Sequence, residues 1–162
     1  MACLMGLPII FVCEDNELAV HTHKSLRHGY DSIVDIISKF NCQVLQEETT
    51  DGENIYKLAS KAIDLVNTAR RPCFIHLKYY RYLEHVGINS DFNDGYRSKD
   101  EFDEWYKVDP VRVQRDKLIG LGYSEDEIKK FESSICEQID DIVIKVKKSS
   151  FVDVSELYNE VF

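Results

Sequence analysis

The sequence predicts an α/β fold, a partial domain built on a parallel sheet and followed by a helical C-terminal tail. Residues 7–13 form an unbroken apolar run rich in β-branched residues, which is typical of a strand buried on both faces. Two segments with the spacing of amphipathic helices alternate with this run and with two further strand candidates. After about residue 98, charged segments with helical spacing dominate the chain.

The first helix and the second strand follow a polar stretch. Apolar side chains recur at helical spacing over residues 31–40, and Asp31 or Ser32 is available as the N-cap. Residues 43–46 favour a short strand, and residues 50–52 (Thr-Asp-Gly) have the composition of a turn. We therefore expect a short amphipathic helix that leads into a strand.

A stronger helix and a third strand come next. Apolar residues of this second helix recur at i, i+3, i+4, i+7, i+8 and i+11, so they form one stripe along it. Pro72 predicts that the helix ends near Arg70, and residues 73–80 are the third strand candidate. The order strand, helix, strand, helix, strand favours right-handed crossovers and hence a parallel sheet. The stripe consists of Ile55, Leu58, Ala59, Ala62, Ile63 and Val66.

The tail is predicted to be helical. Asp109-Pro110 is a helix start with an acidic cap and proline at the first position, and residues 124–127 (Ser-Glu-Asp-Glu) form a capping box. We interpret residues 1–98 as a partial α/β domain and residues 99–162 as a helical extension packed on the same domain. The apolar positions expected to pack are Ile128, Phe131, Ile135, Ile139 and Ile142 on one helix face, with Leu157, Val161 and Phe162 beyond it.

Length and charge limit the class of protein. The chain has 162 residues, 44% of them hydrophobic and 30% charged, which is the composition of a folded globular protein. With 29 acidic and 20 basic residues the formal net charge is −9, so a surface that neutralises nucleic-acid phosphates is not expected. The sequence therefore predicts no nucleic-acid partner.

Cysteine usage and hydropathy indicate a cytoplasmic protein. The five cysteines are scattered and contain no C-x-x-C pair, so we expect reduced, mostly buried thiols rather than disulfides or a zinc site. The longest apolar stretch, residues 1–13, lacks a basic leader and is shorter than the ~20 residues that span a bilayer. We therefore expect neither an export signal nor a membrane anchor. The cysteines are Cys3, Cys13, Cys42, Cys73 and Cys136.

Polar segments follow two of the predicted strands, after Cys13 and after Tyr80. Ligands of parallel α/β sheets bind beyond the carboxyl ends of the strands, so the chemistry is expected in these segments. Residues 81–97 are too long and too polar for a simple connection. Taken alone, Asn16 indicates a turn residue and His85 a solvated loop histidine.

Two other polar groups favour a structural interpretation. His21, His23 and His28 lack carboxylates at a metal-binding spacing and indicate a flexible histidine cluster. Asp91 and Asp94 lack the twelve-residue pattern of a calcium loop, which predicts a solvated acidic loop.

Two segments carry a resemblance to a known family. Residues 7–20 (LPIIFVCEDNELAV) resemble the strand and metal-binding turn of the α subunit of thiamine-diphosphate-dependent 2-oxo acid dehydrogenases, usually written L-P-V-I-F-V-x-E-N-N-x-Y-A-I. Residues 80–85 (YRYLEH) and residues 95–98 (GYRS) are similar to its Y-R-x-x-x-H loop and Y-R-S/T segment. Glu104-Trp105 and Asp109-Pro110 are similar to its E-W…D-P continuation. Order and spacing agree with the carboxyl-terminal half of that subunit.

The resemblance implies the residues of a site. Asn16 matches the Asn whose side-chain oxygen binds Mg²⁺, and Leu18 matches the residue whose main-chain carbonyl does so, which makes both metal and cofactor-binding residues. His85 matches the active-site His that contacts the cofactor and manages protons, and Arg81 matches the Arg that shapes the same loop. The family's third ligand, the Asp of a G-D-G motif, has no match in this sequence.

The resemblance also implies a function. Residues 1–98 would be part of a thiamine-diphosphate-binding domain, with thiamine diphosphate and Mg²⁺ as cofactors. The family carries out oxidative decarboxylation of a small 2-oxo acid and transfers the acyl group to a lipoyl carrier. The implied partners are the N-terminal part of the α subunit and a β subunit in a heterotetramer, without which the chain would be inactive.

Two alternative functions remain open at this point. Leu83-Glu84 and Val86 depart from the residues usual around the active-site His, which favours a thiamine-dependent carboligase or non-oxidative decarboxylase subunit. The unmatched G-D-G motif favours a non-catalytic fragment that only binds a partner subunit.

Overall fold

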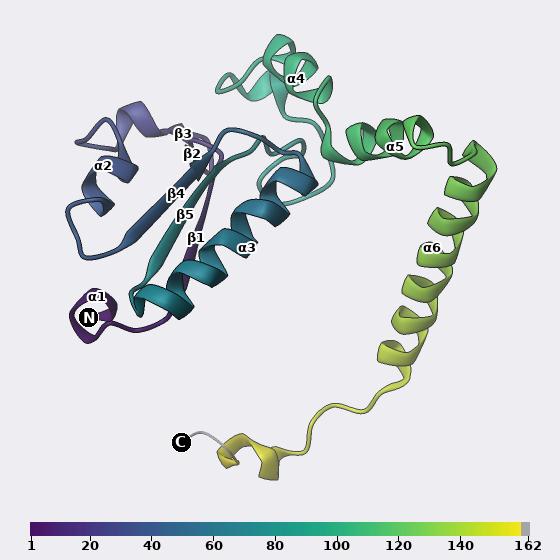
Figure 1. Ribbon diagram of the computed structural model, residues 1–162. Helices are drawn as coiled ribbons and strands as arrows, with labels where there is room; N and C mark the ends of the chain where they lie inside the picture. The colour runs from purple at the N-terminus through teal and green to yellow at the C-terminus, as the bar shows by residue number, and fades with distance from the viewer. Residues whose placement is uncertain (160–162) are drawn as a thin grey trace. The chain divides into compact units, whose positions relative to one another are not determined.

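The computed structural model describes residues 1–159 and confirms a mixed α/β fold with a parallel sheet (Figure 1). The chain divides into two compact units, residues 1–114 and a second unit that begins at Arg115. The first unit holds every strand, and the two units are described separately.

Three strands form the parallel sheet of the first unit. They are β1 (Ile10–Asp15), β4 (Gln43–Glu47) and β5 (Cys73–Lys78), in the order β1-β5-β4 with both pairs parallel. Ile10 and Gln43 both lie opposite Cys73, so all three strands start at one level and their carboxyl ends meet at the same edge. The three predicted strands and their parallel arrangement are confirmed.

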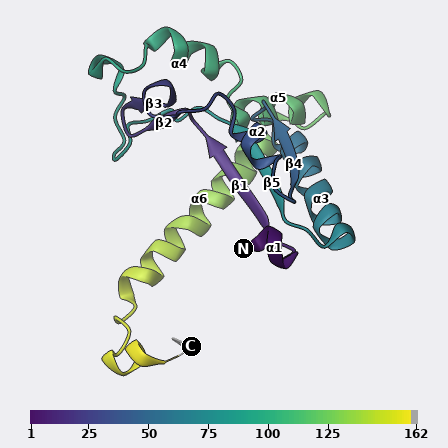
Figure 2. The same ribbon diagram turned by 90° about the vertical axis from the view of Figure 1, so that its left-hand side faces the viewer.

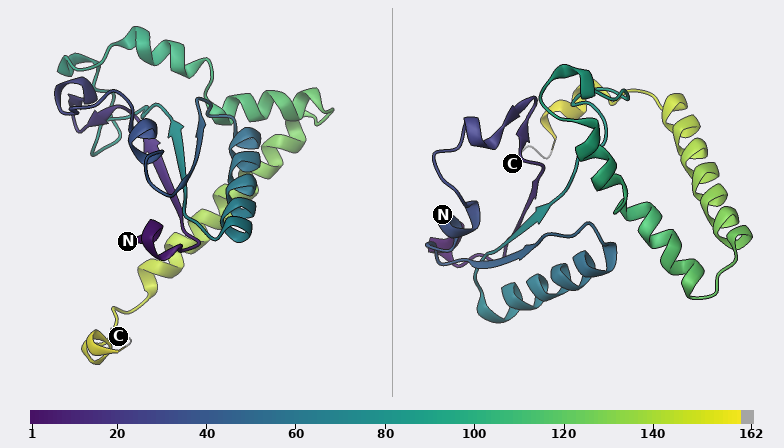
Figure 3. Two further views of the ribbon diagram at one scale, coloured as in Figure 1. Left: turned by 60° about the vertical axis from the view of Figure 1, so that its left-hand side comes forward. Right: turned by 90° about the horizontal axis from the view of Figure 1, so that it is seen from above.

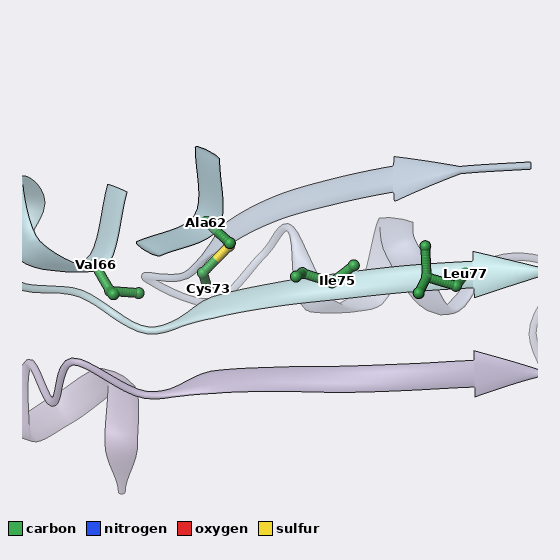
Figure 4. Close-up of a cluster of buried hydrophobic side chains, with 5 residues drawn as sticks. All are labelled: Ala62, Val66, Cys73, Ile75 and Leu77. Carbon is green, nitrogen blue, oxygen red and sulfur yellow. The ribbon is translucent and has the colours of Figure 1, made fainter. Parts of the chain in front are cut away.

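Helix α3 (Gly52–Ala69) covers one face of this sheet (Figure 1). It begins at Asp51, whose side chain accepts a hydrogen bond from Glu53 N, and it ends at Arg70 just before Pro72, as predicted. Its small side chains at the contact, Ala62 and Val66, allow the helix to approach the strand closely. Figure 4 shows the resulting buried cluster of Ala62, Val66, Cys73, Ile75 and Leu77.

The burial expected of the first strand is found instead in β5. Phe11 and Val12 in β1 are 44% and 57% exposed, so the prediction of a strand buried on both faces was wrong. The physical reason is that β1 lies at the edge of the sheet, whereas β5 has a strand on each side and α3 above it. An apolar run carries no information about which strands will flank it.

The remaining elements of the first unit are short (Figure 2). Helix α2 (Ile33–Ile37) is shorter than the predicted 31–40, and Ser32 is its N-cap, accepting from Asp35 N at 3.1 Å. The other elements are α1 (Ala2–Met5), the hairpin of β2 (Leu18–Ala19) and β3 (Thr22–His23), 3₁₀ turns at Lys24–Leu26 and Phe92–Asp94, and α4 (Lys99–Tyr106).

The tail is helical, as predicted (Figure 3). Its elements are α5 (Pro110–Gly120), α6 (Glu125–Lys148) and a 3₁₀ turn at Val154–Tyr158, and the capping box at Ser124 is present with both of its hydrogen bonds. Ile128 is buried, but the other four apolar residues of the predicted face are 43% to 68% exposed. The packing of residues 99–162 on the same domain stays a prediction, and Val161 and Phe162 lie outside the described residues.

All five cysteines are free thiols, as expected. Only Cys73 is buried, Cys136 is exposed and the others are half-buried, so the expectation of mostly buried thiols was too strong. Within residues 1–159, every helix is too short or too polar to cross a membrane.

Candidate functional site

A polar pocket of about 420 Å³ lies at the carboxyl edge of the sheet, on the face opposite α3. Side chains alternate between faces along a strand. Because Ile75 and Leu77 point to α3, the intervening His76 and Lys78 point to the other face. The pocket is lined from β1 and the turn after it (Cys13, Glu14, Asp15, Asn16, Leu18), from the next segment (Lys24, Arg27, His28, Tyr30, Asp31, Ser32, Ile33, Val34), and from β4 and β5 (Gln46, Glu48, His76, Lys78).

Strand register arranges the floor of this pocket in rows. His76 lies opposite Cys13 on one side and opposite Gln46 on the other. One step further along, Lys78 lies opposite Asp15, and its Nζ is 3.1 Å from Glu48 Oε1. The carboxyl half of this sheet face is therefore polar and charged.

Two side chain to main chain hydrogen bonds fix the turn after β1. Asp15 Oδ1 accepts from Glu17 N at 2.8 Å, and Asn16 Oδ1 accepts from Leu18 N at 2.9 Å. Each bond spans two residues, the pattern of an Asx turn. Asn16 also donates from Nδ2 to the Tyr79 hydroxyl at 3.3 Å. The turn thus holds Asn16 at the mouth of the pocket.

The main-chain carbonyl of Leu18 faces the same side as Asn16. Lys24 N donates to Glu17 O at 2.8 Å, so these two residues form a hydrogen-bonded pair across the hairpin. Bonded and non-bonded pairs alternate in an antiparallel ladder, so the next pair, Leu18 with His23, directs its main-chain groups outward. The Leu18 N–H bond to Asn16 Oδ1 agrees with this direction.

A charged cluster holds the hairpin closed. The Glu17 carboxylate accepts a hydrogen bond from Lys24 Nζ and lies 3.4 Å from His23 Nε2. The hydrogen bond from Lys24 lowers the pKa of Glu17 and raises the pKa of Lys24. Glu17 itself has a φ of 63°, in the left-handed region, so the tertiary contacts hold this residue in a strained conformation.

His76 and Asp15 form a pair beneath the turn. His76 is only 5% exposed, and its Nε2 lies 3.1 Å from Asp15 Oδ2. Burial raises the pKa of Asp15, but the hydrogen bonds from Glu17 N and His76 outweigh it and leave that pKa below its usual range. Asp15 is therefore ionised at neutral pH. His76 Nδ1 is buried and has no hydrogen-bond partner in the described part of the chain.

Arg81 ties the loop after β5 to the hairpin. Its guanidinium donates to the Tyr96 hydroxyl at 2.8 Å, to Leu83 O at 3.0 Å and to Val20 O at 3.4 Å. Its Nη1 lies 3.3 Å from His85 Nδ1. His85 is exposed and is not among the residues that line the pocket, so Arg81 links it to the hairpin that follows the Asn16 turn.

A buried ion pair shapes this loop, and the expectation that Asp91 is solvated was wrong. Asp91 is 4% exposed, and its carboxylate accepts from Arg97 Nε at 2.6 Å and from the Tyr96 hydroxyl. Burial raises the pKa of Asp91, but the hydrogen bonds from Tyr96 and Arg97 bring it below its usual range. Arg97 also donates to the carbonyls of Arg81 and Leu83. A carboxylate is buried here because several donors compensate its desolvation.

Aromatic rings pack around Arg97 and join the loop to α4. The Arg97 guanidinium lies over the Tyr80 ring, 5.3 Å from its centroid, and Trp105 stacks on the same ring, which anchors the loop to α4.

In the described part of the chain, His21, Asp91 and Asp94 are the only grouping of potential metal-ligating side chains. Because Arg97 and Tyr96 already occupy the Asp91 carboxylate, we assign this grouping to the ion pair rather than to a metal.

Sequence reasoning missed His76, Asp15 and the Asp91–Arg97 pair. The alternation of side chains along a strand would have shown only that His76 and Lys78 share the face opposite to Ile75. The burial of His76 and the partner of Asp91 depend on strands and loop segments distant in sequence.

Comparison with known proteins identifies the family. A family model described as dehydrogenase E1 component matches residues 1–155. The chain belongs to this family.

Individual relatives align with all or nearly all of this chain. It is 28% identical to the pyruvate dehydrogenase E1 component subunit alpha of Rickettsia felis, over 100% of this chain and 49% of that protein. It is 27% identical to the mitochondrial 2-oxoisovalerate dehydrogenase subunit alpha 1 of Arabidopsis thaliana, over 99% and 34% respectively. It is 26% identical to the pyruvate dehydrogenase E1 component subunit alpha of Rhizobium meliloti, over 99% of this chain and 46% of that protein.

The chain spans about half the length of the E1 relatives it matches, or less. The resemblance seen in the sequence motifs is confirmed at the level of the family. The roles of Asn16, Leu18, Arg81 and His85 stay predictions, because the comparisons concern the chain as a whole.

Proposed function

We propose that this chain is part of the α subunit of a thiamine-diphosphate-dependent 2-oxo acid dehydrogenase. The observation that carries the proposal is the turn after β1. It holds Asn16 Oδ1 at the carboxyl edge of a parallel sheet through the Leu18 N–H, and the pairing of Leu18 with His23 is expected to direct the Leu18 carbonyl out of the hairpin. The family membership and the pyruvate and 2-oxoisovalerate dehydrogenase relatives support it.

The donor set of this turn fits Mg²⁺. Mg²⁺ prefers oxygen ligands and keeps several positions for phosphate and water. An amide oxygen and a main-chain carbonyl are such ligands, and the Leu18 bond uses only one of the two lone pairs of Asn16 Oδ1. Asn16 and Leu18 would therefore hold the metal, which in turn holds the diphosphate.

His85 and Arg81 would act next to the bound cofactor. When bound, thiamine diphosphate supplies the nucleophilic carbon and the electron sink for decarboxylation of a 2-oxo acid. His85, on the loop tied to the hairpin by Arg81, would contact the diphosphate and hold a proton on its imidazole. Arg81 would keep this loop closed against the turn.

The proposal includes partners that complete the site. These are the N-terminal part of the α subunit, a β subunit in a heterotetramer, a small 2-oxo acid and a lipoyl carrier as acyl acceptor. The exposed apolar side chains of edge strand β1 support a companion at that edge. A cytoplasmic location belongs to the same proposal.

The test is a binding measurement on the chain co-expressed with its neighbouring subunit genes. Calorimetry should show binding of thiamine diphosphate that requires Mg²⁺. Asn16→Ala should weaken Mg²⁺ affinity at least about tenfold, since it removes a ligand. His85→Ala should lower 2-oxo acid turnover. Asn54→Ala, an exposed Asn on the α3 side of the sheet, is the matched control and should behave as wild type.

Other outcomes would overturn the proposal. Wild-type binding and turnover in both Asn16→Ala and His85→Ala would remove its basis. Carboligation without lipoyl dependence would favour the non-oxidative alternative suggested by Leu83-Glu84 and Val86. Absence of cofactor binding in the assembled complex would favour a chain that only binds a partner subunit.

A further inference from the structure

Within residues 1–159, the buried histidine beneath the Asn16–Leu18 turn has a single hydrogen-bond partner. His76 lies on central strand β5 and is 5% exposed, with its Nε2 3.1 Å from Asp15 Oδ2. Its Nδ1, buried as well, has no partner among the residues that the structure describes. A buried imidazole with half of its hydrogen-bonding capacity unused stabilises a fold less than an apolar side chain of similar size. Its position therefore calls for an explanation other than packing.

Two hydrogen bonds in succession connect His76 to the Asn16–Leu18 turn. The hydrogen bond between His76 Nε2 and Asp15 Oδ2 spans 61 residues, so it ties central strand β5 to the residue at the start of the turn. The other Asp15 oxygen accepts from Glu17 N at 2.8 Å, in the middle of the Asn16–Leu18 turn. Glu17 has a φ of 63° and needs such contacts to stay in that conformation.

We propose that His76 is a positioning residue which, through Asp15, sets the angle at which Asn16 Oδ1 and the Leu18 carbonyl face the metal. This inference rests on the proposed function. His76 binds neither metal nor substrate; it orients a carboxylate, and the carboxylate orients the turn. Hydrogen-bond partners behind the ligands of a metal set its affinity strongly. The path runs from the rigid centre of the sheet to its carboxyl edge.

The readout is metal affinity measured apart from catalysis. Mn²⁺ replaces Mg²⁺ in the co-expressed complex with thiamine diphosphate, and electron paramagnetic resonance gives the fraction of bound Mn²⁺. His76→Leu should weaken Mn²⁺ affinity about tenfold or more. The kcat at saturating metal should change little, because the ligands themselves remain, whereas the metal concentration for half-maximal activity should rise.

Two variants separate positioning from stability. His76→Gln places an amide N–H near the position of Nε2 and should restore affinity to within about threefold of wild type. His76→Asn keeps a polar side chain that is too short to reach Asp15. If His76→Leu fails to fold, His76→Asn takes its place, and its Mn²⁺ affinity should be weakened about tenfold or more. Gln46→Leu removes a polar side chain from the same row of the sheet without touching Asp15, and it should bind Mn²⁺ as wild type does.

The outcomes distinguish this inference from the proposed function. If folded His76→Leu or His76→Asn binds Mn²⁺ as tightly as wild type while Asn16→Ala does not, only the role of His76 is overturned. If Asn16→Ala also binds normally, the turn holds no metal and the proposed function fails with it. Equal losses in His76→Gln, His76→Leu and Gln46→Leu would show a general loss of pocket structure and overturn the inference.

Discussion

The segments that follow β1 and β5 are both held in place by hydrogen bonds, but these bonds span very different distances along the chain. The turn after β1 is fixed by hydrogen bonds between residues two apart, from Glu17 N to Asp15 and from Leu18 N to Asn16. The loop after β5 is fixed by Arg97, which reaches Asp91, Leu83 and Arg81 across 6, 14 and 16 residues. The turn has its own hydrogen bonds between near neighbours, with support from His76 on β5, whereas the loop exists only when its ends have come together. The loop should therefore be the more fragile of the two.

The largest expected effect comes from breaking the buried ion pair of the loop. Arg97→Leu leaves the buried Asp91 carboxylate with only the Arg81 guanidinium, at 3.8 Å, as its cation, and it removes a donor from the carbonyls of Arg81 and Leu83. This change should lower the free energy of unfolding by about 3–5 kcal/mol. Urea unfolding monitored by Trp105 fluorescence measures it.

The double variant Asp91→Leu/Arg97→Leu tests the cause. Without the Asp91 carboxylate it should recover part of the loss, because the penalty arises from a buried carboxylate that has lost its nearest cation. Lys99→Ala, which removes an exposed ion pair with Asp103, should change stability by no more than about 1 kcal/mol. A loss in Arg97→Leu no greater than in Lys99→Ala would contradict the role of the pair.

A pH series sharpens the comparison between the two segments. Asp91 and Asp15 both have a pKa below the usual value of about 4 in the folded state. Each therefore contributes stability that is present above pH ~4 and is lost as the pH falls through the lower folded pKa. Asp91→Asn and Asp15→Asn should each flatten the acid limb of the stability curve, because each removes a carboxyl whose folded pKa is lowered by its hydrogen bonds.

Urea unfolding at intervals from pH 7 to pH 2.5 measures these slopes. A wild-type curve parallel to that of Asp91→Asn over the whole range would show that the Asp91 carboxylate does not stabilise the loop.

The smallest effect is expected at the tip of the loop. Glu84 Oε1 accepts hydrogen bonds from Asn89 N at 3.1 Å and from Asn89 Nδ2 at 2.8 Å, which closes a short turn on the surface. Glu84→Ala should cost about 1 kcal/mol, confined to residues 84–89. Amide exchange at Asn89 should quicken several-fold while Leu18 N–H is unchanged; equal quickening at both would mean that loop and turn are not independent.

This difference explains what the sequence could predict. Strand and helix positions, the Ser32 and Ser124 caps and the turn at Asn16 follow from spacing and local hydrogen bonding, so they were accessible. The edge position of β1, the burial of His76 and the partner of Asp91 depend on residues far along the chain, which spacing does not reveal. The matched motif pointed to Asn16 and His85, but not to the residues that hold them in place.

The proposed role of Leu18 as a main-chain ligand also determines how freely its position can vary. A main-chain carbonyl is the same chemical group in every amino acid, so side-chain identity at position 18 has no direct bearing on metal chemistry. Proline is the exception, because Leu18 N–H is the donor that fixes Asn16. A search pattern for this turn should therefore require asparagine at the first ligand and accept any residue except proline two places later.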